Sequence, residues 1–412
     1  MRINCVKGTN DYLPEVQALR DYLQGVILRT YQNNGYERIA TPIIEDIENL
    51  DNSDGGENLK LIFKVMKRGE KLSKALEAGR FDDLADMGLR YDLTLPLTRY
   101  YSANRDKLAK PFKVIQMGDV FRAEQPQKGR LRQFVQCDID VIGSDAPSVE
   151  IECINVMGKA LQNIGIKNFK MKINDRRVLN AMLTSAGFAK EDLMSVCISF
   201  DKLDKIGVDG VVGELTEKGF RPEVIAKFRS LIEGGEITLE KAMDFCEDKT
   251  AAENLKHIID VSNELAAGAY ETVFDMSLVR GQGYYTGTIF EVESLDFGSS
   301  IAGGGRYDNL VGKFLGEDIP ACGFSIGFER ICAILMDQGF EIPGRPKKFA
   351  VVFDEDQVAE AIRYADGKRG EYDVTLVPKT GKLGKLFGRL EGQGFVGCYV
   401  MGDESEKMFG ER

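Results

Sequence analysis

Residues 111–143 read PFKVIQMGDVFRAEQPQKGRLRQFVQCDIDVIG. From Gln133 to Ile142 this stretch alternates with a period of two, which is the side-chain period of a β-strand. The apolar positions are Val135, Cys137, Ile139 and Val141, and the polar positions between them are Gln136, Asp138 and Asp140. The pattern predicts a strand with one buried apolar face and one polar face.

A second strand is expected just before it. The sequence is apolar up to Phe121 and then alternates, so that Arg122 and Glu124 share one face. The connecting QPQKGRLR contains proline and glycine, which favour a turn, and three cations: Lys128, Arg130 and Arg132. The stretch therefore predicts two antiparallel strands joined by a basic loop.

The polar face of this hairpin has two interpretations. If the hairpin lay at the edge of a sheet, its carboxylates would simply be solvated. A carboxylate-rich face on a central strand is costly unless it meets a ligand or paired charges. Because such polar clusters tend to mark functional sites, we interpret the face as a binding site.

Composition limits what the whole chain can be. With 412 residues, the chain is long for a single core, and we expect two or three domains. A hydrophobic content of 43% and a charged content of 29% are typical of a soluble globular protein. We see no apolar run long enough for a membrane span, and MRINCVKGTN has no apolar signal segment, so we expect no membrane association. A net charge of −11 argues against indiscriminate polyanion binding and a DNA partner, although local charge can still bind a nucleic acid.

The cysteines and the histidine exclude several site types. The 8 cysteines form no CxxC pair, and His257 is the only histidine. A disulfide scaffold and a Cys/His zinc site are therefore not expected, and a cytoplasmic location fits. His257 lies in the helical pattern NLKHIID, and we expect it on a helix surface. A Ser-His-Asp mechanism would have to use this residue.

The chain before the hairpin begins with a helical pattern from Glu15 that stops at Asn33-Asn34-Gly35. A short strand from Tyr36 to Thr41 runs into Pro42. Residues 51–86 are charged and weakly periodic, which indicates short helices and loop. Next, Arg90, Asp92 and Thr94 alternate as on one face of a short strand, and Pro96 marks the turn into a helix.

The chain after the hairpin is helical at 148–166 and extended at 169–173. It is then helical from Arg176 to about Ala267, and we interpret this long helical stretch as an inserted subdomain.

After the helical stretch the sequence again has a strand pattern, which contains GQGYYTG. This motif fails the GxGxxG pattern because Thr286 takes the position of the last glycine. Gly303-Gly304-Gly305 predicts close approach of the backbone to a ligand or another strand. In GFSIGFERI, Arg330 near a helix start calls for a compensating anion. Beyond a linker at Gly344-Arg345-Pro346, a βαβαβ pattern of about 65 residues predicts a small, partly parallel sheet.

With these blocks in order, the sequence resembles the histidyl-tRNA synthetase family of class II aminoacyl-tRNA synthetases. The segments that carry the resemblance are KGTNDYLP, GYERIATPIIE, GDVFRAEQPQKGRLRQFVQCDIDVIG, RGQGYYTGTIFE, AGGGRYDNL and GFSIGFERI. The second of these, with Pro42, resembles the family's dimer-forming motif, which implies a homodimer. The implied fold is α+β, an antiparallel sheet flanked by helices. The expected organisation is a catalytic core in two parts (1–175 and 268–343), a helical insertion (176–267), and a shortened anticodon-binding-like domain (347–412).

The resemblance also implies roles for single residues. Arg122 would hold the ATP α-phosphate, Glu124 would lie near the adenine, and Arg330 would hold the γ-phosphate. Arg280 would stabilise charge during adenylate formation, so Arg122 and Arg280 are the expected catalytic residues. The expected histidine-binding residues are Asp92, Thr94 and Gln136 for the ammonium and carboxylate region, and Asp140 and Tyr285 for the imidazole.

The chemistry agrees with this set. Attack of the histidine carboxylate on ATP brings two anions together, which requires guanidinium groups and Mg²⁺ with the ATP, and no metal ligands or nucleophile from the protein itself are expected. The basic loop at Lys128, Arg130 and Arg132 could meet the tRNA acceptor end through its phosphates. Two departures stand out: Gly283 replaces an acidic residue of the family signature beside Gln282, and the C-terminal domain is short.

Two other functions remain open. The regulatory subunit of ATP phosphoribosyltransferase resembles the same core and senses histidine without catalysis, but it lacks the C-terminal domain and loses active-site residues. A paralogue could instead make an adenylate for another acceptor. The retained arginines favour the synthetase, with histidine, ATP and tRNA(His) as its substrates.

Overall fold

The computed structural model describes residues 3–51, 60–80, 83–127, 129–235, 237–280 and 284–410. The chain divides into two compact units, Met1–Phe340 and Glu341–Arg412. No helix in these described ranges is long and apolar enough to cross a membrane.

The first unit is built on a mixed sheet that, over the described residues, has eight strands in the order β1-β5-β6-β11-β10-β9-β7-β8. Its strands are β1 (Glu37–Arg38), β5 (Phe112–Phe121), β6 (Gln133–Ile142), β7 (Phe169–Asp175), β8 (Glu271–Phe274), β9 (Thr288–Ser294), β10 (Ser299–Arg306) and β11 (Ala321–Gly327). The outermost pairs, β1 with β5 and β7 with β8, are parallel, and the pairs between them are antiparallel. The predicted hairpin is confirmed, since β5 and β6 pair from Phe112 opposite Ile142 to Phe121 opposite Gln133.

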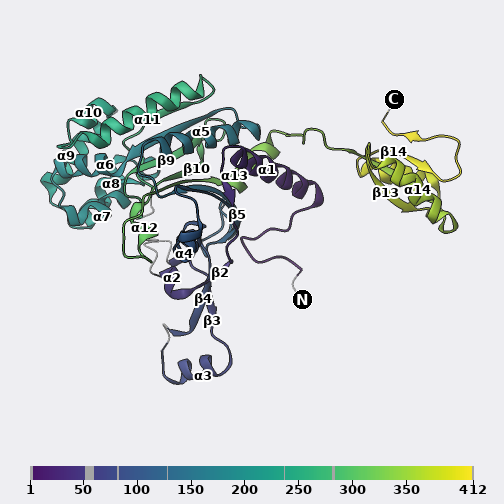
Figure 1. The fold of residues 1–412 in the computed structure, drawn as a ribbon, viewed down its shortest axis with the longest axis horizontal. Helices are drawn as coiled ribbons and strands as arrows, with labels where there is room; N and C mark the ends of the chain where they lie inside the picture. Colours follow the sequence, from purple (N-terminus) through teal and green to yellow (C-terminus); the bar gives the residue numbers. More distant parts are fainter. Residues whose placement is uncertain are drawn as a thin grey trace. The chain divides into compact units, whose positions relative to one another are not determined.

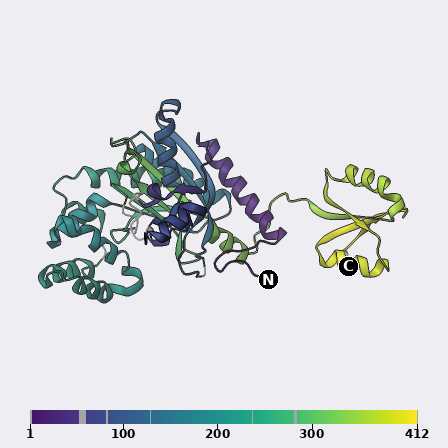
Figure 2. The ribbon, with the colours of Figure 1, turned by 90° about the horizontal axis from the view of Figure 1, so that it is seen from below.

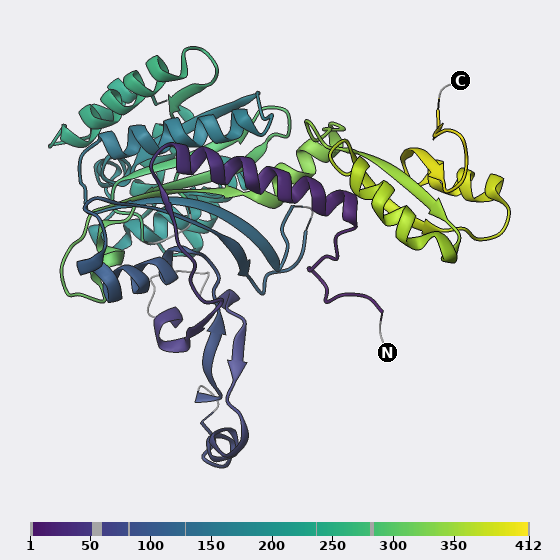
Figure 3. The same cartoon turned by 45° about the vertical axis from the view of Figure 1, so that its right-hand side comes forward.

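Helices cover the apolar face of the hairpin. The flanking helices are α1 (Pro14–Asn33), α5 (Ser148–Asn163), α11 (Thr250–Ala266) and α13 (Phe328–Asp337). Helices α1 and α5 lie side by side, and α11 packs on α5 (Figure 3). Cys137 and Ile139 of β6 are fully buried, and Tyr31 of α1 donates a hydrogen bond to the Cys137 carbonyl at 3.3 Å. His257 lies exposed on α11, as the sequence predicts.

The polar face of the hairpin looks the other way, where two short helices close one end of the site. These are α4 (Thr94–Asn104) and α12 (Asp308–Gly312). Leu97 of α4 and Leu310 of α12 belong to one hydrophobic cluster with Val114 of β5. Val114 is paired with Asp140, so both side chains are on the same face of the sheet.

A small second sheet leaves the first unit as an arm (Figure 1). Its strands are β2 (Ile44–Asp46), β3 (Lys64–Met66) and β4 (Ala85–Leu89), in the order β2-β4-β3, with α2 (Ile47–Asp51) and α3 (Gly69–Glu77). The prediction of only short helices and loop for 51–86 was therefore wrong about the strands. Strands of three residues are too short for a period-two pattern to be visible in the sequence. Residues 52–59 and 81–82 lie outside the described residues.

Two further strand predictions need correction. Arg90, Asp92 and Thr94 do not alternate along a strand, because β4 ends at Leu89 and Thr94 already begins α4. Asp92 instead accepts a hydrogen bond from the Leu95 N–H at 3.2 Å, as a carboxylate at a helix start does. Similarly, β5 ends before Arg122 and Glu124, because Ala123 leaves the hairpin and donates its N–H to the Leu61 carbonyl at 2.8 Å. The strand predicted at 36–41 is limited to β1.

Helices follow one another after β7, and most of them gather in one group (Figure 2). They are α6 (Arg176–Ala186), α7 (Leu193–Phe200), α8 (Leu203–Glu217), α9 (Pro222–Glu233) and α10 (Leu239–Met243). This helical segment belongs to the same compact unit as the large sheet. Its role as a separate subdomain over 176–267 stays a prediction.

The second unit has the predicted βαβαβ order. Its elements are β12 (Lys347–Phe353), α14 (Val358–Lys368), β13 (Tyr372–Pro378), α15 (Leu383–Gly392), β14 (Phe395–Val400) and β15 (Lys407–Met408). The strand order is β13-β12-β14-β15, and β12 is parallel to both β13 and β14. Leu386 and Leu390 of α15 pack on one set of core residues, and Ala361 and Ala365 of α14 pack on the other. Burial on both faces agrees with the continuous apolar run of β12.

Candidate active site

A cavity of about 910 Å³ is lined by the polar side chains of β6 together with residues of β9, β10, β11 and the start of α13. Of the residues predicted for the site, the following line it: Asp92, Thr94, Arg122, Glu124, Arg130, Gln136, Asp140, Arg280, Tyr285 and Arg330. Since β6 lies between β5 and β11, its polar face is not the solvated face of an edge hairpin. Asp138 and Asp140 are each only 4% exposed. The alternative interpretation, in which the hairpin lies at the edge of a sheet with solvated carboxylates, is therefore wrong.

Asp140 and Tyr307 meet deep in this cavity. The Tyr307 hydroxyl donates a hydrogen bond to Asp140 Oδ1 at 2.5 Å, and both side chains are buried. Tyr284 packs against Tyr285 and Tyr307, with ring centroids 4.9 and 6.0 Å apart. Burial raises the pKa of Asp140 to about 7 against the lowering effect of the Tyr307 hydrogen bond, and the Asp92 carboxylate adds to the rise. This corner thus presents a titratable carboxylate among tyrosine rings.

Two glycines make room for the charged side chains. A Cβ added to Gly323 of β11 would lie 1.8 Å from Asp140 Oδ1, and one added to Gly303 of β10 would lie 1.7 Å from Arg280 Nη1. Both distances are far below any van der Waals contact, so the site needs glycine at these positions. Gly304 approaches another strand, since its Cβ would lie 1.9 Å from the Gly323 carbonyl oxygen. The predicted close approach at Gly303-Gly304-Gly305 is thereby confirmed.

Carboxylates gather on this face of the sheet beyond Asp140. Burial raises the pKa of Asp92, and burial followed by repulsion from Asp140 raises the pKa of Asp138 well above its usual value. Buried carboxylates of this kind are costly to ionise unless a cation or a donor meets them. The cavity is therefore suited to a ligand that carries positive charge or N–H groups at this end.

Arginines occupy the rest of the cavity wall. Arg122 donates from Nε to the Tyr91 carbonyl at 3.0 Å, and its guanidinium lies 5.1 Å from the Phe134 ring centroid. Arg330 donates from Nη1 to the Ser300 carbonyl. Burial, followed by the neighbouring Arg130, lowers the pKa of Arg330. Such a concentration of guanidinium groups favours a polyanion such as a triphosphate.

Arg280 has an unusual backbone. Its φ is +54°, in the left-handed region that a non-glycine residue adopts at a cost. Its side chain lies over β9 and β10, where Nη1 is 3.1 Å from the Phe290 carbonyl oxygen and 3.4 Å from Glu291 Oε2. Arg176 holds the Arg280 carbonyl with a hydrogen bond of 2.8 Å. Gln282 and Gly283, where the sequence departs from the family signature, lie outside the described residues.

Glu329 anchors the helix that carries Arg330. Arg20 of α1 binds it through two hydrogen bonds of 2.6 and 2.9 Å, and the Val135 N–H and the Tyr12 hydroxyl also donate to it. The carboxylate of Glu329 is therefore already engaged by Arg20. Glu291 and Glu124 favour the charged form of Arg330, but burial and the neighbouring Arg130 outweigh them and its pKa is lowered, so a further anion would compensate its charge.

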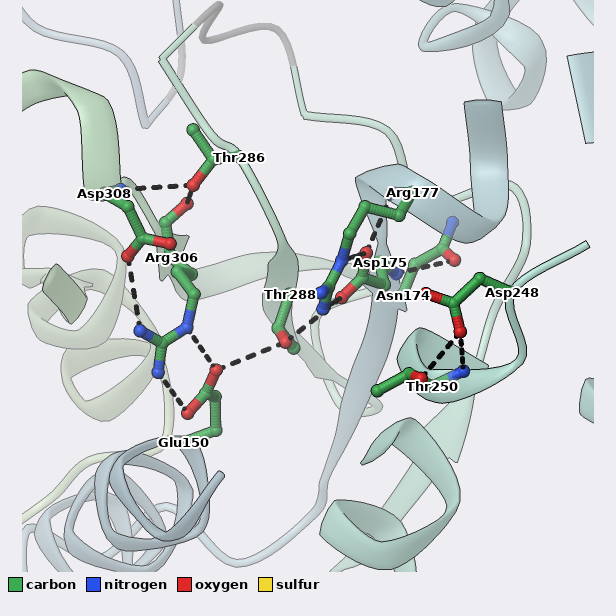
Figure 4. A network of polar contacts seen from close by, with 10 residues as sticks. All are labelled: Glu150, Asn174, Asp175, Arg177, Asp248, Thr250, Thr286, Thr288, Arg306 and Asp308. Atoms are coloured by element: carbon green, nitrogen blue, oxygen red, sulfur yellow. Dashed lines mark hydrogen bonds and ion pairs between the residues drawn. The ribbon is translucent and has the colours of Figure 1, made fainter. Parts of the chain in front are cut away.

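A buried polar network lies behind the site (Figure 4). Arg306 donates to Glu150 of α5 from Nε and Nη2 at 2.6 and 2.7 Å, and to Asp308 from Nη1 at 3.2 Å. Asp308 in turn accepts the Ala321 N–H at 3.0 Å, and its own N–H donates to Thr286 Oγ1 at 3.1 Å. These bonds fix the end of β10 against α5 and β11, and so they fix the backbone on which Tyr307 is placed.

The basic loop is only partly accounted for. Arg130 lines the cavity and pairs with Glu124 at 3.5 Å. Arg132 is not among the residues that line the cavity. It donates to the carbonyls of Glu124 and Lys7 at 3.0 and 3.4 Å, which ties the opening segment to the hairpin. Lys128 lies outside the described residues.

Several residues of the cavity wall were missed by sequence reasoning. Tyr307 and Ser325 lie inside quoted motifs but had no assigned role, and Asp138 was recognised only as a polar position. Asp201 and Lys202 come from the helical segment, whose contact with the cavity no periodicity could indicate. Over the described residues, no group of three or more histidines, cysteines or acidic residues could hold a metal ion.

A large, mainly antiparallel sheet flanked by helices, with a separate small C-terminal sheet domain, fits the α+β fold of class II aminoacyl-tRNA synthetases. The sequence profile of histidyl-tRNA synthetase matches residues 8–331. The chain belongs to the histidyl-tRNA synthetase family.

Individual relatives agree over most of their length. The chain is 42% identical over 363 residues to a histidine–tRNA ligase of Leifsonia xyli subsp. xyli, covering 84% of this chain and 83% of that protein. It is 34% identical over 404 residues to a histidine–tRNA ligase of Christiangramia forsetii, covering 92% and 88%. Among solved structures, histidyl-tRNA synthetase from Nostoc sp. PCC 7120 superposes with a TM-score of 0.78 at 26% identity, covering 98% of this chain and 92% of that one.

Proposed function

We propose that this protein activates histidine with ATP as histidyl-adenylate and transfers the histidyl group to tRNA(His). One observation carries the proposal: a single cavity joins an arginine-lined wall to a tyrosine-flanked buried carboxylate. The arginine-lined wall suits a triphosphate, and the buried carboxylate suits an imidazole. Adenylate formation requires ATP and histidine to be in contact, which one shared cavity allows.

The nucleotide end uses the arginines. Arg122 holds the ATP α-phosphate through its terminal nitrogens, while its Nε donates to the Tyr91 carbonyl. Glu124 lies near the adenine, and Arg330 holds the γ-phosphate. Burial lowers the pKa of Arg330, which implies that its positive charge is poorly solvated and gains from an anion.

The amino acid end reads the histidine side chain from two sides. Asp140 accepts from one ring nitrogen, and the Tyr285 hydroxyl meets the other. Such a pair would discriminate strongly against side chains without matching ring nitrogens, since a wrong side chain leaves buried polar groups unpaired. Asp92, Thr94 and Gln136 bind the ammonium and carboxylate region.

The first step needs no enzyme nucleophile. A carboxylate oxygen of histidine attacks the α-phosphorus, the bond to the bridging oxygen of the pyrophosphate breaks, and pyrophosphate leaves. Arg280 and Arg122 stabilise the charge that grows on the α-phosphate oxygens. In the second step, a terminal ribose hydroxyl of the tRNA forms an ester with the histidyl carbonyl and AMP departs.

A divalent metal accompanies ATP in this family, and we propose Mg²⁺. The described residues provide no protein-only metal cage, which agrees with an ion held mainly by phosphate oxygens and water. Glu291, which lines the cavity, is the carboxylate that would assist it. The ion would neutralise charge on the triphosphate.

The remaining partners are proposals of the same kind. Arg130, Arg132 and Lys128 would meet the acceptor end of the tRNA, and the short domain at 347–412 would contact the anticodon. The segment around Pro42 would form a homodimer, where the exposed Ile43 and Ile44 side chains (41% and 50%) would find a partner. Free cysteines throughout the described chain suit a reducing compartment such as the cytoplasm.

The alternative of a non-catalytic histidine sensor is not favoured. The relatives with the stated identities are named as ligases, and the arginines expected for catalysis line the cavity together. Charging of tRNA(His) with radiolabelled histidine by the full chain tests the proposal. Stable histidyl-tRNA is expected, and histidine binding without any charging would contradict it.

A further inference from the structure

The end of β7 holds the stretch of backbone that leads to Arg280. Asn174 is fully buried, and its side-chain amide donates to the carbonyls of Met276 and Leu278 at 3.1 and 3.0 Å. Its Oδ1 accepts the Asp175 N–H at 2.8 Å. Both N–H donors of this amide are thus engaged, and Asn174 fixes the approach to Arg280 against the large sheet.

Arg176 holds the backbone at Arg280 itself and beyond it. This residue is buried and opens α6. Its Nη2 donates to the Arg280 carbonyl at 2.8 Å, and its N–H donates to the Gly287 carbonyl at 2.9 Å. Over the described residues, no other hydrogen bond reaches the Arg280 main chain. The place of Arg176 is in turn fixed, because Asp175 caps α6 by accepting the Arg177 N–H at 2.8 Å.

Arg280 needs such a restraint because its φ of +54° lies in the region that residues with a Cβ adopt at a cost. At a negative φ the Cα–Cβ bond would point in another direction, and the guanidinium would leave its place over β10. In that place Nη1 lies 3.1 Å from the Phe290 carbonyl oxygen and fills the space that a Cβ on Gly303 would take. The orientation of the side chain therefore depends on the backbone of Arg280.

We infer that Arg176 is a positioning residue for adenylate formation. Its hydrogen bond to the Arg280 carbonyl holds Arg280 in the left-handed conformation that places the guanidinium in the cavity. The inference rests on the proposed function, in which Arg280 stabilises charge on the α-phosphate, and it extends that function to a residue that touches neither substrate. Arg176 and Asn174 are both absent from the cavity wall.

The first variant is Arg176→Met, which keeps most of the side-chain volume and removes the donor. Adenylate formation in single-turnover assays on the full chain should slow by about tenfold to a hundredfold, because a displacement of about 1 Å in a catalytic group can have that effect. Affinities for L-histidine and ATP should change by less than about threefold, since Arg176 does not line the cavity. Arg176→Lys keeps the charge and a donor, and it should recover part of the rate.

A double variant separates positioning from a structural role. If Arg176 acts through Arg280, adding Arg176→Met to Arg280→Ala should slow adenylate formation by less than about threefold beyond Arg280→Ala alone. A further loss as large as the one in the wild-type background would overturn the inference. A normal rate in Arg176→Met alone would overturn it as well.

Arg177→Ala is the matched control, because Arg177 is the neighbouring arginine on the same turn of α6. Its side chain binds Asp175 with hydrogen bonds of 2.9 and 2.7 Å, on the side of the network shown in Figure 4. Removing it takes a partner from a buried carboxylate, so the melting temperature should fall. The adenylation rate of the folded protein should stay within about twofold of wild type. A loss equal to that of Arg176→Met would overturn the inference in favour of a general effect of stability.

If Arg176→Met does not fold, Arg176→Lys carries the same comparison in the wild-type and Arg280→Ala backgrounds. Its expected loss in the wild-type background is about threefold to tenfold, with no further loss beside Arg280→Ala. A wild-type chain that forms no adenylate from L-histidine and ATP would overturn the proposed function instead. That failure is distinguishable, because no variant is needed to see it.

Discussion

Replacing Asp140 with asparagine should stabilise the fold at pH 8 while it weakens histidine binding. Burial raises the pKa of Asp140 to about 7 from its usual value of 3.8. A carboxyl group whose pKa is raised by folding is harder to ionise in the folded state, so its contribution to stability is lost as the pH rises from about 4 to 7. The difference between 7 and 3.8 corresponds to roughly 4 kcal/mol in the free energy of unfolding.

Asparagine removes this penalty because it has no charge to bury. The raised pKa of Asp140 already includes the hydrogen bond from Tyr307, which a neutral amide oxygen can also accept. The gain should be roughly 4 kcal/mol at pH 8 and about 1–2 kcal/mol at pH 5, where the wild-type group is protonated in the folded state but mostly ionised in the unfolded state. For a unit of this size the gain is a few degrees in melting temperature.

The same substitution should damage the site. Loss of a charged acceptor at a buried imidazole costs about 1.5–3 kcal/mol, which is roughly a tenfold to hundredfold loss of histidine affinity. ATP affinity should be nearly unchanged. In the wild type, histidine affinity should fall as the pH is lowered through about 7, because the protonated carboxyl no longer accepts as an anion.

Melting curves at pH 5 and pH 8, with calorimetric titration of histidine and ATP, measure both effects. Asp201→Asn is the control, since its carboxylate is exposed on the same cavity. A variant that is less stable than wild type at pH 8 would refute the electrostatic reasoning. A parallel loss of histidine and ATP affinity would refute the assignment of Asp140 to histidine.

Three further changes separate the parts of the site. Arg280→Ala should slow adenylate formation by about 10²–10³ in single-turnover assays with a much smaller effect on histidine affinity, because its charge acts in the transition state; a normal rate with a lowered melting temperature would make it a structural residue. Gly323→Ala should lower histidine affinity by up to about a hundredfold in equilibrium titration, since the new Cβ would lie 1.8 Å from Asp140 Oδ1; unchanged affinity would contradict the geometry of the imidazole corner. A chain ending at Gly344 should retain histidine activation and lose most tRNA charging, because the contact boundary lies at Phe340; a folded truncation without pyrophosphate exchange would contradict the separation.

Strand β6 of the central hairpin could be predicted because apolar and polar side chains alternate over its ten residues, even though both of its faces are largely buried. That length makes a period-two pattern unambiguous. The same reasoning failed at Arg90, Asp92 and Thr94, where alternation over a few residues also fits an irregular segment that leads into a helix. The carboxylate at Asp92 was the better signal, because such a residue before a helical run favours a helix start.

Most of the candidate site could be predicted only as polar positions. The alternation placed Asp138 and Asp140 on one face, but it could not show that Tyr307, 167 residues further along the chain, donates to Asp140. Such contacts depend on the order of strands, which places β11 between β6 and β10. The need for glycine at Gly323 has the same origin, since it arises from a side chain on the neighbouring strand.

Histidine-dependent exchange of radiolabelled pyrophosphate into ATP tests the central claim most directly, because it reports the adenylation step without tRNA. The full chain should catalyse exchange with L-histidine and at least about a hundredfold more slowly with the other standard amino acids, because their side chains would leave the buried acceptor at Asp140 unpaired. A protein that binds histidine but supports no exchange would contradict the account and would leave a histidine-binding protein without catalysis.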